Sequence, residues 1–221
     1  MIKLENVTKY YTTKKGKKYI LKNVSMTIPE NTNIGILGVN GAGKSTFLRM
    51  LGGIDYPNKG RIYSDKTFSW VLGLSAGFQG SMTGRQNTKF IGRIFSKSEE
   101  EIKELIKFVK DFSELGDYFD MPIKTYSSGM KSRLSFGISL FFDFDYILID
   151  ETLSVGDARF KEKSKKAIME KIKKSNVLMV SHSMSDLRNI CHSGIILNNG
   201  TLTYFDKIED AIKEYQKINK L

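Results

Sequence analysis

A glycine-rich run with one lysine carries the clearest chemistry in the sequence. It reads GVNGAGKST over residues 38–46, directly after the apolar run NIGIL and before the helical pattern TFLRML. Glycines let a loop curl so that successive N–H groups point inward at an anion, and a following helix start adds positive dipole. Lys44 would then reach the β- and γ-phosphates of ATP, and Ser45 would give its hydroxyl to Mg²⁺. The residues expected to hold the nucleotide here are Gly38, Asn40, Gly41, Ala42, Gly43, Lys44, Ser45 and Thr46.

A second run, DYILIDE at residues 145–151, is expected to serve the same chemistry. Its apolar residues predict a short strand that carries Asp150 and Glu151 to the strand's end. Asp150 is expected to hold Mg²⁺, directly or through water. Glu151 is expected to act as general base on the attacking water, because in-line hydrolysis needs a carboxylate beyond the γ-phosphate. Lys44 and Glu151 are therefore candidate catalytic residues of an ATPase.

His182 is the third candidate catalytic residue. It follows the apolar run NVLMVS and precedes a helical pattern, so it stands at the carboxyl edge of the expected sheet. Doubly wound sheets bind their ligands at this edge, where His182 could touch the γ-phosphate. The alternative is a hydrogen-bonded structural histidine. His192 has no such context.

Composition limits the classes of protein that need to be considered. The 221 residues, 40% hydrophobic and 27% charged, suit one globular domain with a sizeable core. The net charge is +11, but only seven of the 35 basic residues are Arg, so nucleic acid is not expected as a partner. A lone Cys191 and a first segment without a signal-peptide pattern favour a reducing cytosol. No apolar run approaches the roughly 18 residues that span a bilayer, so a membrane role would need a partner.

Hydropathy patterns predict an α/β core interrupted by a helical insert. Helical periodicity runs from about Thr83 to Phe142, and Ser98 with Glu101 forms a capping-box pattern inside it. Strand-like runs precede this insert at residues 2–7, 19–28, 33–38 and 68–74.

The chain beyond the insert predicts a parallel sheet and a closing helix. The apolar runs at residues 146–150 and 176–181, separated by a lysine-rich helix at about 160–174, indicate a βαβ unit. Asn199 and Gly200 predict a hairpin turn, and an amphipathic helix is expected to follow from Ile208.

A second anion-binding pattern is the run TYSSGMKSRLSF at residues 125–136, which predicts a helix start with two serines and a glycine. Free N–H groups at such a start bind an anion well, although the glycine loop already offers a better cradle. In order and spacing, these motifs resemble the ATP-binding cassette family, over about residues 2–215. In that family two nucleotide-binding subunits pack head to tail. The resemblance therefore implies a homodimer in which Ser127, Ser128 and Gly129 cover ATP held by the other subunit, whereas a plain helix cap is the alternative.

The resemblance implies further contacts to the nucleotide and its metal. An aromatic residue should stack on adenine, and Tyr11 is our choice, with Tyr19 as the rival. Asp157 matches the position of a family aspartate that contacts the glycine loop of the partner subunit. The alternative role for Asp157 is that of a helix cap. Gln79 is the natural candidate for the family's metal-sensing glutamine, although it lies closer to the TGRQN segment than the usual spacing, and a solvated loop glutamine is the alternative.

Within the family, three runs resemble ATPase subunits that export bacterial capsular polysaccharides: AGFQGSMTGRQN, YSSGMKSRLSF and DETLSVGDARFKEK. That resemblance implies a position at the cytoplasmic face of the bacterial inner membrane. It also implies an integral membrane transport subunit as partner, which we expect to contact the segment from Phe78 to Phe95.

Other readings of the function stay open. Exporters of teichoic acid or of lipopolysaccharide O-antigen are close relatives, and the absence of a carbohydrate-binding extension after Leu221 disfavours some of the latter. A soluble cassette ATPase of repair or translation would usually carry two cassettes or a coiled coil. A catalytically inactive interaction module would lose Lys44 or Glu151, and both are retained.

The fold class implied by the resemblance is an α/β, ABC-type P-loop nucleotide-binding domain. Its RecA-like core would comprise residues 1–77 and 140–221 and carry an antiparallel β subdomain. Its helical subdomain would cover about residues 78–139, within a single domain of residues 1–221.

Overall fold

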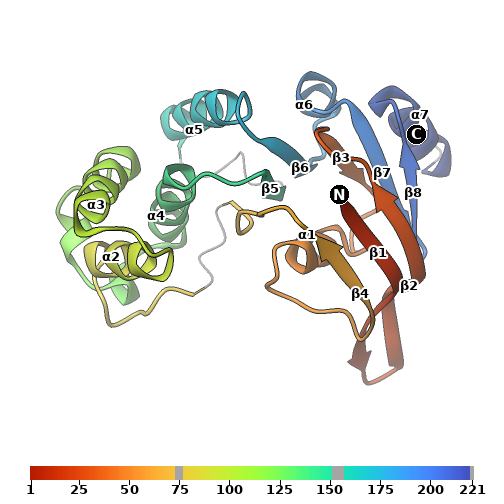
Figure 1. Cartoon of the computed structure of the whole chain (residues 1–221), viewed down its shortest axis with the longest axis horizontal. Coiled ribbons are helices and arrows are strands. Elements are labelled where there is room, and N and C mark those ends of the chain that lie inside the picture. Colours follow the sequence, from red (N-terminus) through yellow and green to blue (C-terminus); the bar gives the residue numbers. More distant parts are fainter. Residues whose placement is uncertain (73–76, 151–156, 220–221) are drawn as a thin grey trace. The chain divides into compact units, whose positions relative to one another are not determined.

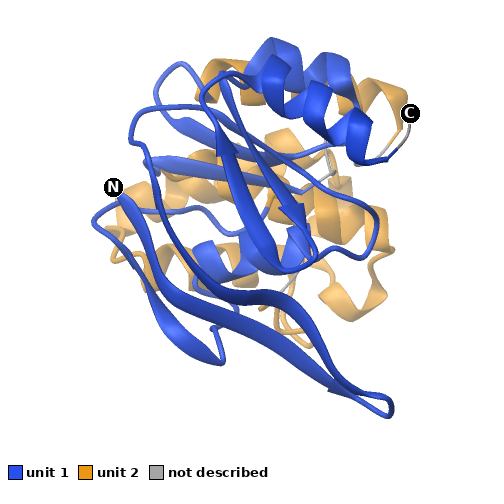
Figure 2. Cartoon of the chain, turned by 90° about the vertical axis from the view of Figure 1, so that its right-hand side faces the viewer, with its two compact units in different colours: residues 1–71, 144–151, 172–221 blue, residues 72–143, 152–171 orange. Residues whose placement is uncertain are grey.

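The computed structural model describes residues 1–72, 77–150 and 157–219. The chain divides into two compact units (Figure 2). Residues 1–71, 144–151 and 172–221 form the core unit, and residues 72–143 and 152–171 form the helical unit. The helical unit thus extends beyond the expected residues 78–139 and also takes in the lysine-rich helix.

The core unit contains a five-stranded sheet in the order β5-β6-β3-β7-β8 (Figure 1). The strands are β3 (Ile34–Leu37), β5 (Tyr146–Asp150), β6 (Asn176–Val180), β7 (Ser193–Asn198) and β8 (Thr201–Phe205). β8 runs antiparallel to β7, and the other neighbours are parallel, which confirms the predicted βαβ unit and hairpin. β3, β5 and β6 are almost wholly buried, because a parallel sheet is covered on both faces.

Helices cover both faces of this sheet. They are α1 (Lys44–Leu51), α6 (Met184–Ile190) and α7 (Ile208–Ile218). A Cβ on Gly35 of β3 would lie 2.8 Å from Ile208 Cδ1 and 2.9 Å from Leu187 Cδ2, so α6 and α7 pack closely on that face. Leu148 of β5 faces the other way and lies against Gly52 at the end of α1. α7 is the predicted closing helix, with its apolar residues buried.

An antiparallel sheet in the order β2-β1-β4 completes the core unit. Its strands are β1 (Ile2–Thr13), β2 (Gly16–Ile28) and β4 (Lys59–Ser64), as the predicted antiparallel subdomain requires. The turn between β1 and β2 sets Tyr11 opposite Lys18 and Tyr10 opposite Tyr19. Because opposed residues share a face and neighbours alternate, Tyr11 and Tyr19 lie on different faces of this hairpin.

The helical unit begins and ends its main helices close to the predicted positions. Its elements are α2 (Gly84–Ile94), α3 (Glu99–Ser113), the 3₁₀ turns η1 (Gly116–Asp120) and η2 (Ile123–Thr125), α4 (Ser128–Phe141) and α5 (Ala158–Lys171). Thr83 caps the start of α2, and the predicted capping box of Ser98 and Glu101 is present at α3. Rings of Phe112, Phe136 and Phe160 pack within 6.5 Å of one another, which joins α5 to α3 and α4. Among the residues described, no helix combines the length and the apolar character that crossing a membrane requires.

The strand expected over residues 68–74 was a wrong prediction for its described part, residues 68–72. Phe68 forms only an isolated parallel bridge with Tyr146. One step further, the Leu148 N–H donates to Ser69 Oγ at 3.0 Å, so a side chain takes the place of a backbone partner and the pairing ends. Val71 and Leu72 are buried outside any strand, whereas Phe68 and Trp70 are half-buried.

Candidate functional site

The glycine loop between β3 and α1 curls around the ammonium group of Lys44. Lys44 Nζ donates to the carbonyl oxygens of Gly38 at 2.7 Å and Val39 at 3.3 Å, and the side chain is buried. Gly43 has a φ of 111°, which glycine adopts freely, and a Cβ there would lie 2.2 Å from Ile20 Cγ2. The backbone therefore forms a tight cradle that carries a positive charge, as binding of a phosphate requires.

A cavity of about 480 Å³ opens beside this loop. Its lining residues are Tyr11, Lys18, Ile20, Asn40, Gly41, Gly43, Lys44, Ser45, Thr46 and His182. The core unit thus brings together most of the glycine loop, one of the two candidate tyrosines and the candidate histidine. Gly38 and Ala42 belong to the same loop but are not among the lining residues.

Asp150 reaches the same edge of the sheet as the glycine loop. It pairs with Val180 of β6, and Val180 pairs in turn with Ile36 of β3. With strands about 4.8 Å apart, Asp150 lies about 10 Å across the sheet from Ile36. Asp150 and Ser45 are both half-buried oxygen donors, which suits a Mg²⁺ ion that takes its other ligands from phosphates and water. Glu151, the candidate general base, lies outside the described residues.

The two candidate tyrosines are separated by position rather than by exposure. Tyr11 is 39% exposed and Tyr19 is 41% exposed. Tyr11 lines the cavity, whereas the Tyr19 ring lies against Tyr10, with centroids 5.4 Å apart, on the other face of the hairpin. This geometry favours Tyr11. Lys18, opposite Tyr11, is a cavity residue that sequence reasoning missed, because only the register of the hairpin places it there.

Ser127 caps the start of α4 in the helical unit. Its Oγ accepts from the Met130 N–H at 3.2 Å and keeps its own O–H for another partner. Ser127 and Ser128 are exposed, and Gly129 is half-buried. The preceding Tyr126 is buried and donates its phenol to the Tyr118 carbonyl oxygen, and burial raises its pKa to about 12. The helix start is thus anchored by Tyr126, while its serine hydroxyls stay accessible.

Gln79 is exposed, and its backbone is held by a side chain that sequence reasoning did not identify. The Gln79 N–H donates to Asn87 Oδ1 at 2.9 Å, and Asn87 Nδ2 donates to the Gln79 carbonyl at 3.1 Å. Asn87 is buried in α2 and also donates to the carbonyls of Met82 and Thr83. No pattern in the run TGRQN distinguishes this asparagine from a surface residue.

The Gln79 segment is also hydrogen-bonded to the residues that lead to Ser127. The Lys124 N–H donates to the Gly80 carbonyl and the Ile123 N–H to the Met82 carbonyl, each at 2.9 Å. A movement of the Gln79 segment would therefore reach the start of α4 through backbone contacts.

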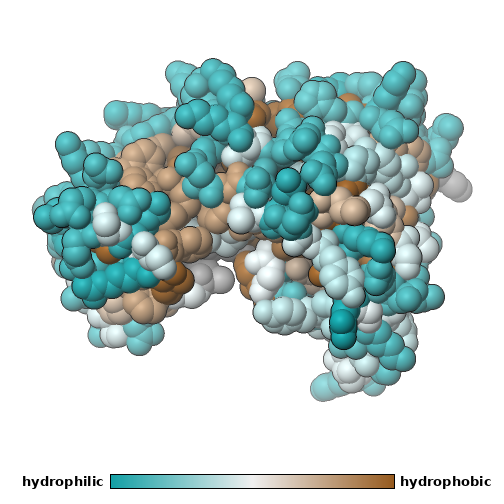
Figure 3. Space-filling model, viewed as in Figure 1, coloured by the Kyte–Doolittle hydropathy of each residue, from teal (hydrophilic) through white to brown (hydrophobic). Residues whose placement is uncertain are grey.

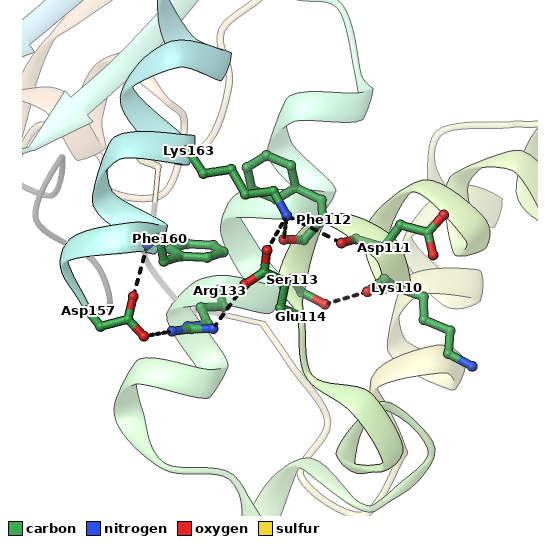
Figure 4. A network of polar contacts seen from close by, with 9 residues as sticks. All are labelled: Lys110, Asp111, Phe112, Ser113, Glu114, Arg133, Asp157, Phe160 and Lys163. Carbon is green, nitrogen blue, oxygen red and sulfur yellow. Dashed lines mark hydrogen bonds and ion pairs between the residues drawn. The ribbon is translucent and has the colours of Figure 1, made fainter.

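Asp157 lies in a polar network at the start of α5 (Figure 4). Its Oδ1 accepts from the Phe160 N–H at 2.9 Å, as in a helix cap, and its Oδ2 accepts from Arg133 Nη2 at 2.8 Å. The Phe160 N–H and the Arg133 guanidinium hold the pKa of Asp157 below its ordinary value. Lys163 and Glu114 extend the network with a 2.8 Å ion pair. The contact of Asp157 with a partner subunit stays a prediction.

Comparison with known proteins identifies the family of the chain. A family model for the ABC transporter matches residues 21–154. The polysialic acid transport ATP-binding protein KpsT of Escherichia coli is 51% identical over 100% of this chain and 99% of its own length. The ATP-binding protein BexA of Haemophilus influenzae is 43% identical, with 100% of each chain covered.

Solved structures agree on the fold. The dimeric, post-hydrolysis structure of the ATP-binding cassette MJ0796 bound to ADP and Pi has a TM-score of 0.75 and 24% identity, covering 94% of this chain and 99% of that chain. Fold and glycine loop together define a P-loop nucleotide-binding ATPase, which confirms the predicted fold class. The chain belongs to the ABC transporter family.

Proposed function

We propose that the chain is the ATP-binding and ATP-hydrolysing subunit of an exporter that moves a capsular polysaccharide across the bacterial inner membrane. The cargo is inferred from the similarity of the full chain to three relatives. They are KpsT, BexA and the capsule polysaccharide export ATP-binding protein CtrD of Neisseria meningitidis, at 41–51% identity. The cavity beside the glycine loop is the structural observation that supports nucleotide binding.

In this proposal the core unit binds MgATP. The loop amides and the Lys44 ammonium group receive the β- and γ-phosphates, and Tyr11 meets the adenine at the other wall of the cavity. Mg²⁺, when bound by Ser45 and Asp150, would neutralise phosphate charge. Glu151 would take a proton from the attacking water, and His182 would contact the γ-phosphate from the end of β6.

The working form is proposed to be a homodimer. The exposed hydroxyls of Ser127 and Ser128 and the first N–H groups of α4 would meet the γ-phosphate held by the second subunit. Asp157 would meet that subunit's glycine loop. Two-fold symmetry then gives two identical composite sites, each with one glycine loop and one α4 start.

The membrane partner is proposed to dock on the segment from residue 78 to residue 95, so that the subunit works at the cytoplasmic face of the inner membrane. Hydrophobic residues gather on the helical unit between hydrophilic side chains (Figure 3). Within the segment, Phe90, Ile94 and Phe95 are 48%, 61% and 39% exposed. The apolar residues of the segment that are expected to face the partner are all half-buried or exposed: Phe78, Met82, Phe90, Ile91, Ile94 and Phe95. Exposed apolar surface of this kind suits a short helix of a partner.

Complementation tests the cargo. Production of the chain in Escherichia coli lacking KpsT should restore polysaccharide at the cell surface, measured by capsule staining, whereas the Lys44→Ala variant should not. Strains lacking a teichoic acid or an O-antigen export ATPase serve as comparisons. Rescue of one of these strains without rescue of the capsule would replace the proposed cargo with that polymer.

A further inference from the structure

A partly buried ion pair lies next to Tyr11, the candidate adenine-stacking residue. Lys9 of β1 is 6% exposed. Its Nζ donates to Asp55 Oδ1 at 2.5 Å and to the Tyr56 carbonyl at 2.8 Å. Asp55 follows α1, so the pair links the antiparallel sheet to the helix that carries the glycine loop.

The second carboxylate oxygen of Asp55 contacts Tyr11. The Tyr11 hydroxyl donates to Asp55 Oδ2 at 2.8 Å and lies 3.5 Å from Thr46 Oγ1, itself a lining residue of the cavity. Lys9 Nζ lies 5.0 Å from the centroid of the Tyr11 ring. Because the ring is 39% exposed, packing alone does not fix it, and these polar contacts set its direction.

The charges of this cluster are matched. Partial burial by itself would raise the pKa of Asp55, but the hydrogen bonds from Lys9, Tyr11 and the Tyr56 N–H outweigh it, and the pKa lies below its ordinary value. A buried ion pair gives little net stability compared with apolar residues of similar size. Its direct contact with a cavity-lining ring suggests a role in the site.

We propose that Lys9 and Asp55 are positioning residues: they hold the Tyr11 hydroxyl at the rim of the glycine loop, so that the ring is oriented to stack on the adenine base. This inference rests on the proposed function of Tyr11. It predicts that the ion pair contributes to recognition of the base and leaves recognition of the phosphates unchanged.

The test compares two ligands that share phosphates and differ in the base. Dissociation constants are measured by calorimetry for ADP and for inorganic pyrophosphate, both with Mg²⁺, because neither requires the γ-phosphate site. Tyr11→Phe removes only the hydroxyl. It should weaken ADP binding about threefold to fivefold, the effect of one hydrogen bond, and leave pyrophosphate binding unchanged.

A matched pair of double variants isolates the acceptor. Lys9→Met with Asp55→Asn removes both charges and keeps an oxygen for the Tyr11 hydroxyl. Lys9→Met with Asp55→Ala removes that oxygen as well. ADP should bind about threefold more weakly to the alanine pair than to the asparagine pair, with equal pyrophosphate affinity. If the alanine pair does not fold, Tyr11→Phe alone decides.

Tyr11→Ala separates this inference from the proposed function beneath it. Loss of the ring should weaken ADP binding about tenfold, as expected for base–aromatic stacking. If Tyr11→Ala has this effect while Tyr11→Phe and the alanine pair bind ADP normally, Tyr11 stacks on the adenine, but Lys9 and Asp55 do not position it and the inference is overturned. If Tyr11→Ala leaves ADP binding unchanged, stacking itself is wrong. Equal weakening of both ligands in the Tyr11→Phe variant or the alanine pair would make the cluster a structural support of the loop and would also overturn positioning.

Discussion

The glycine loop of the core unit and the α4 start of the helical unit both present N–H groups at a helix start, but they are built in opposite ways. The Lys44 ammonium group is buried, donates to two carbonyls of its own loop, and lines a cavity whose walls come from several elements. Ser127 is exposed and bonds only within the first turn of its own helix among the described contacts. We call the glycine loop and the α4 start the two half-sites: the first lies in a cavity formed within one chain, and we expect the second to need a surface from another chain.

The largest effect on ATP hydrolysis is expected from Glu151, the candidate general base for ATP bound at the glycine loop. Glu151→Gln keeps the size of the side chain and removes its basicity, so kcat for ATP hydrolysis should fall by about 10²-fold to 10⁴-fold. ATP affinity should stay within about twofold, and the variant should accumulate as an ATP-bound dimer on size-exclusion chromatography. Near wild-type turnover would show that another residue is the base.

Loss of charge in the glycine loop should instead remove binding. Lys44→Ala deletes the ammonium group expected on the β- and γ-phosphates, and charge-assisted hydrogen bonds of this kind account for about 100-fold in affinity. Equilibrium binding of ATP measures this directly. A binding constant close to that of the wild type would mean that the buried Lys44 serves only to shape the loop.

Mixed dimers test whether the two half-sites come from different chains. In a Glu151→Gln background, a Lys44→Ala subunit paired with a Ser127→Arg subunit retains one intact composite site if the sites form in trans. The control places both substitutions in one subunit and pairs it with a subunit that has neither, which leaves no intact trans site. An ATP-dependent closed dimer should form only in the first mixture.

The reverse result would assign both half-sites to one chain. If neither mixture closes while the unsubstituted dimer does, closure needs both sites. Tagged subunits of different size separate the mixed dimers from the parental ones.

Substitutions on the proposed docking segment, residues 78–95, are expected to affect ATP hydrolysis less than they affect export. Met82→Gln should lower export and co-purification of the membrane subunit while basal ATP hydrolysis stays within about twofold, because the change removes apolar contact area only. Met121→Gln is the matched control, since Met121 is 45% exposed in the same unit and outside the segment.

Crosslinking locates that surface independently. Single cysteines are placed through residues 78–95, in a background lacking Cys191, a thiol whose pKa burial raises to about 12. They should react with the membrane subunit. Crosslinks from α5 and none from this segment would move the docking surface there.

Features that depend on one short run of residues could be predicted from the sequence, whereas features that depend on tertiary contacts could not. Motifs confined to one short run, such as the glycine loop and the capping box of Ser98 and Glu101, were located correctly because their geometry is local. The roles of Lys18 and Asn87 were missed, since Lys18 depends on a hairpin register and Asn87 on which side of α2 is buried. The wrong strand at residues 68–74 has the same origin: its composition suits a sheet, but Ser69 supplies a side-chain acceptor where the ladder would continue.

The smallest expected effect concerns the stability of the helical unit in acid. The ion pair with Lys163 holds the pKa of Glu114 below its ordinary value, so the folded state binds the proton less readily than the unfolded state. The pair therefore stabilises the protein above the ordinary pKa of about 4, and this contribution is lost as the pH falls through it toward the lowered folded value.

Glu114→Gln should lower Tm at pH 7 by about 1–3 °C, a small effect because both side chains are one-third exposed and water screens the pair. The difference from the wild type should shrink as the pH falls from 7 to 3, because protonation of Glu114 progressively removes the ion pair. Glu162→Gln is the control, because its pair with Lys166 is mostly exposed and should leave Tm unchanged at either pH. Equal shifts for the two variants, measured by thermal unfolding, would mean that the network around Glu114 adds nothing beyond an ordinary surface pair. A loss confined to Glu114→Gln would show that the contacts joining α3, α4 and α5 hold the helical unit together.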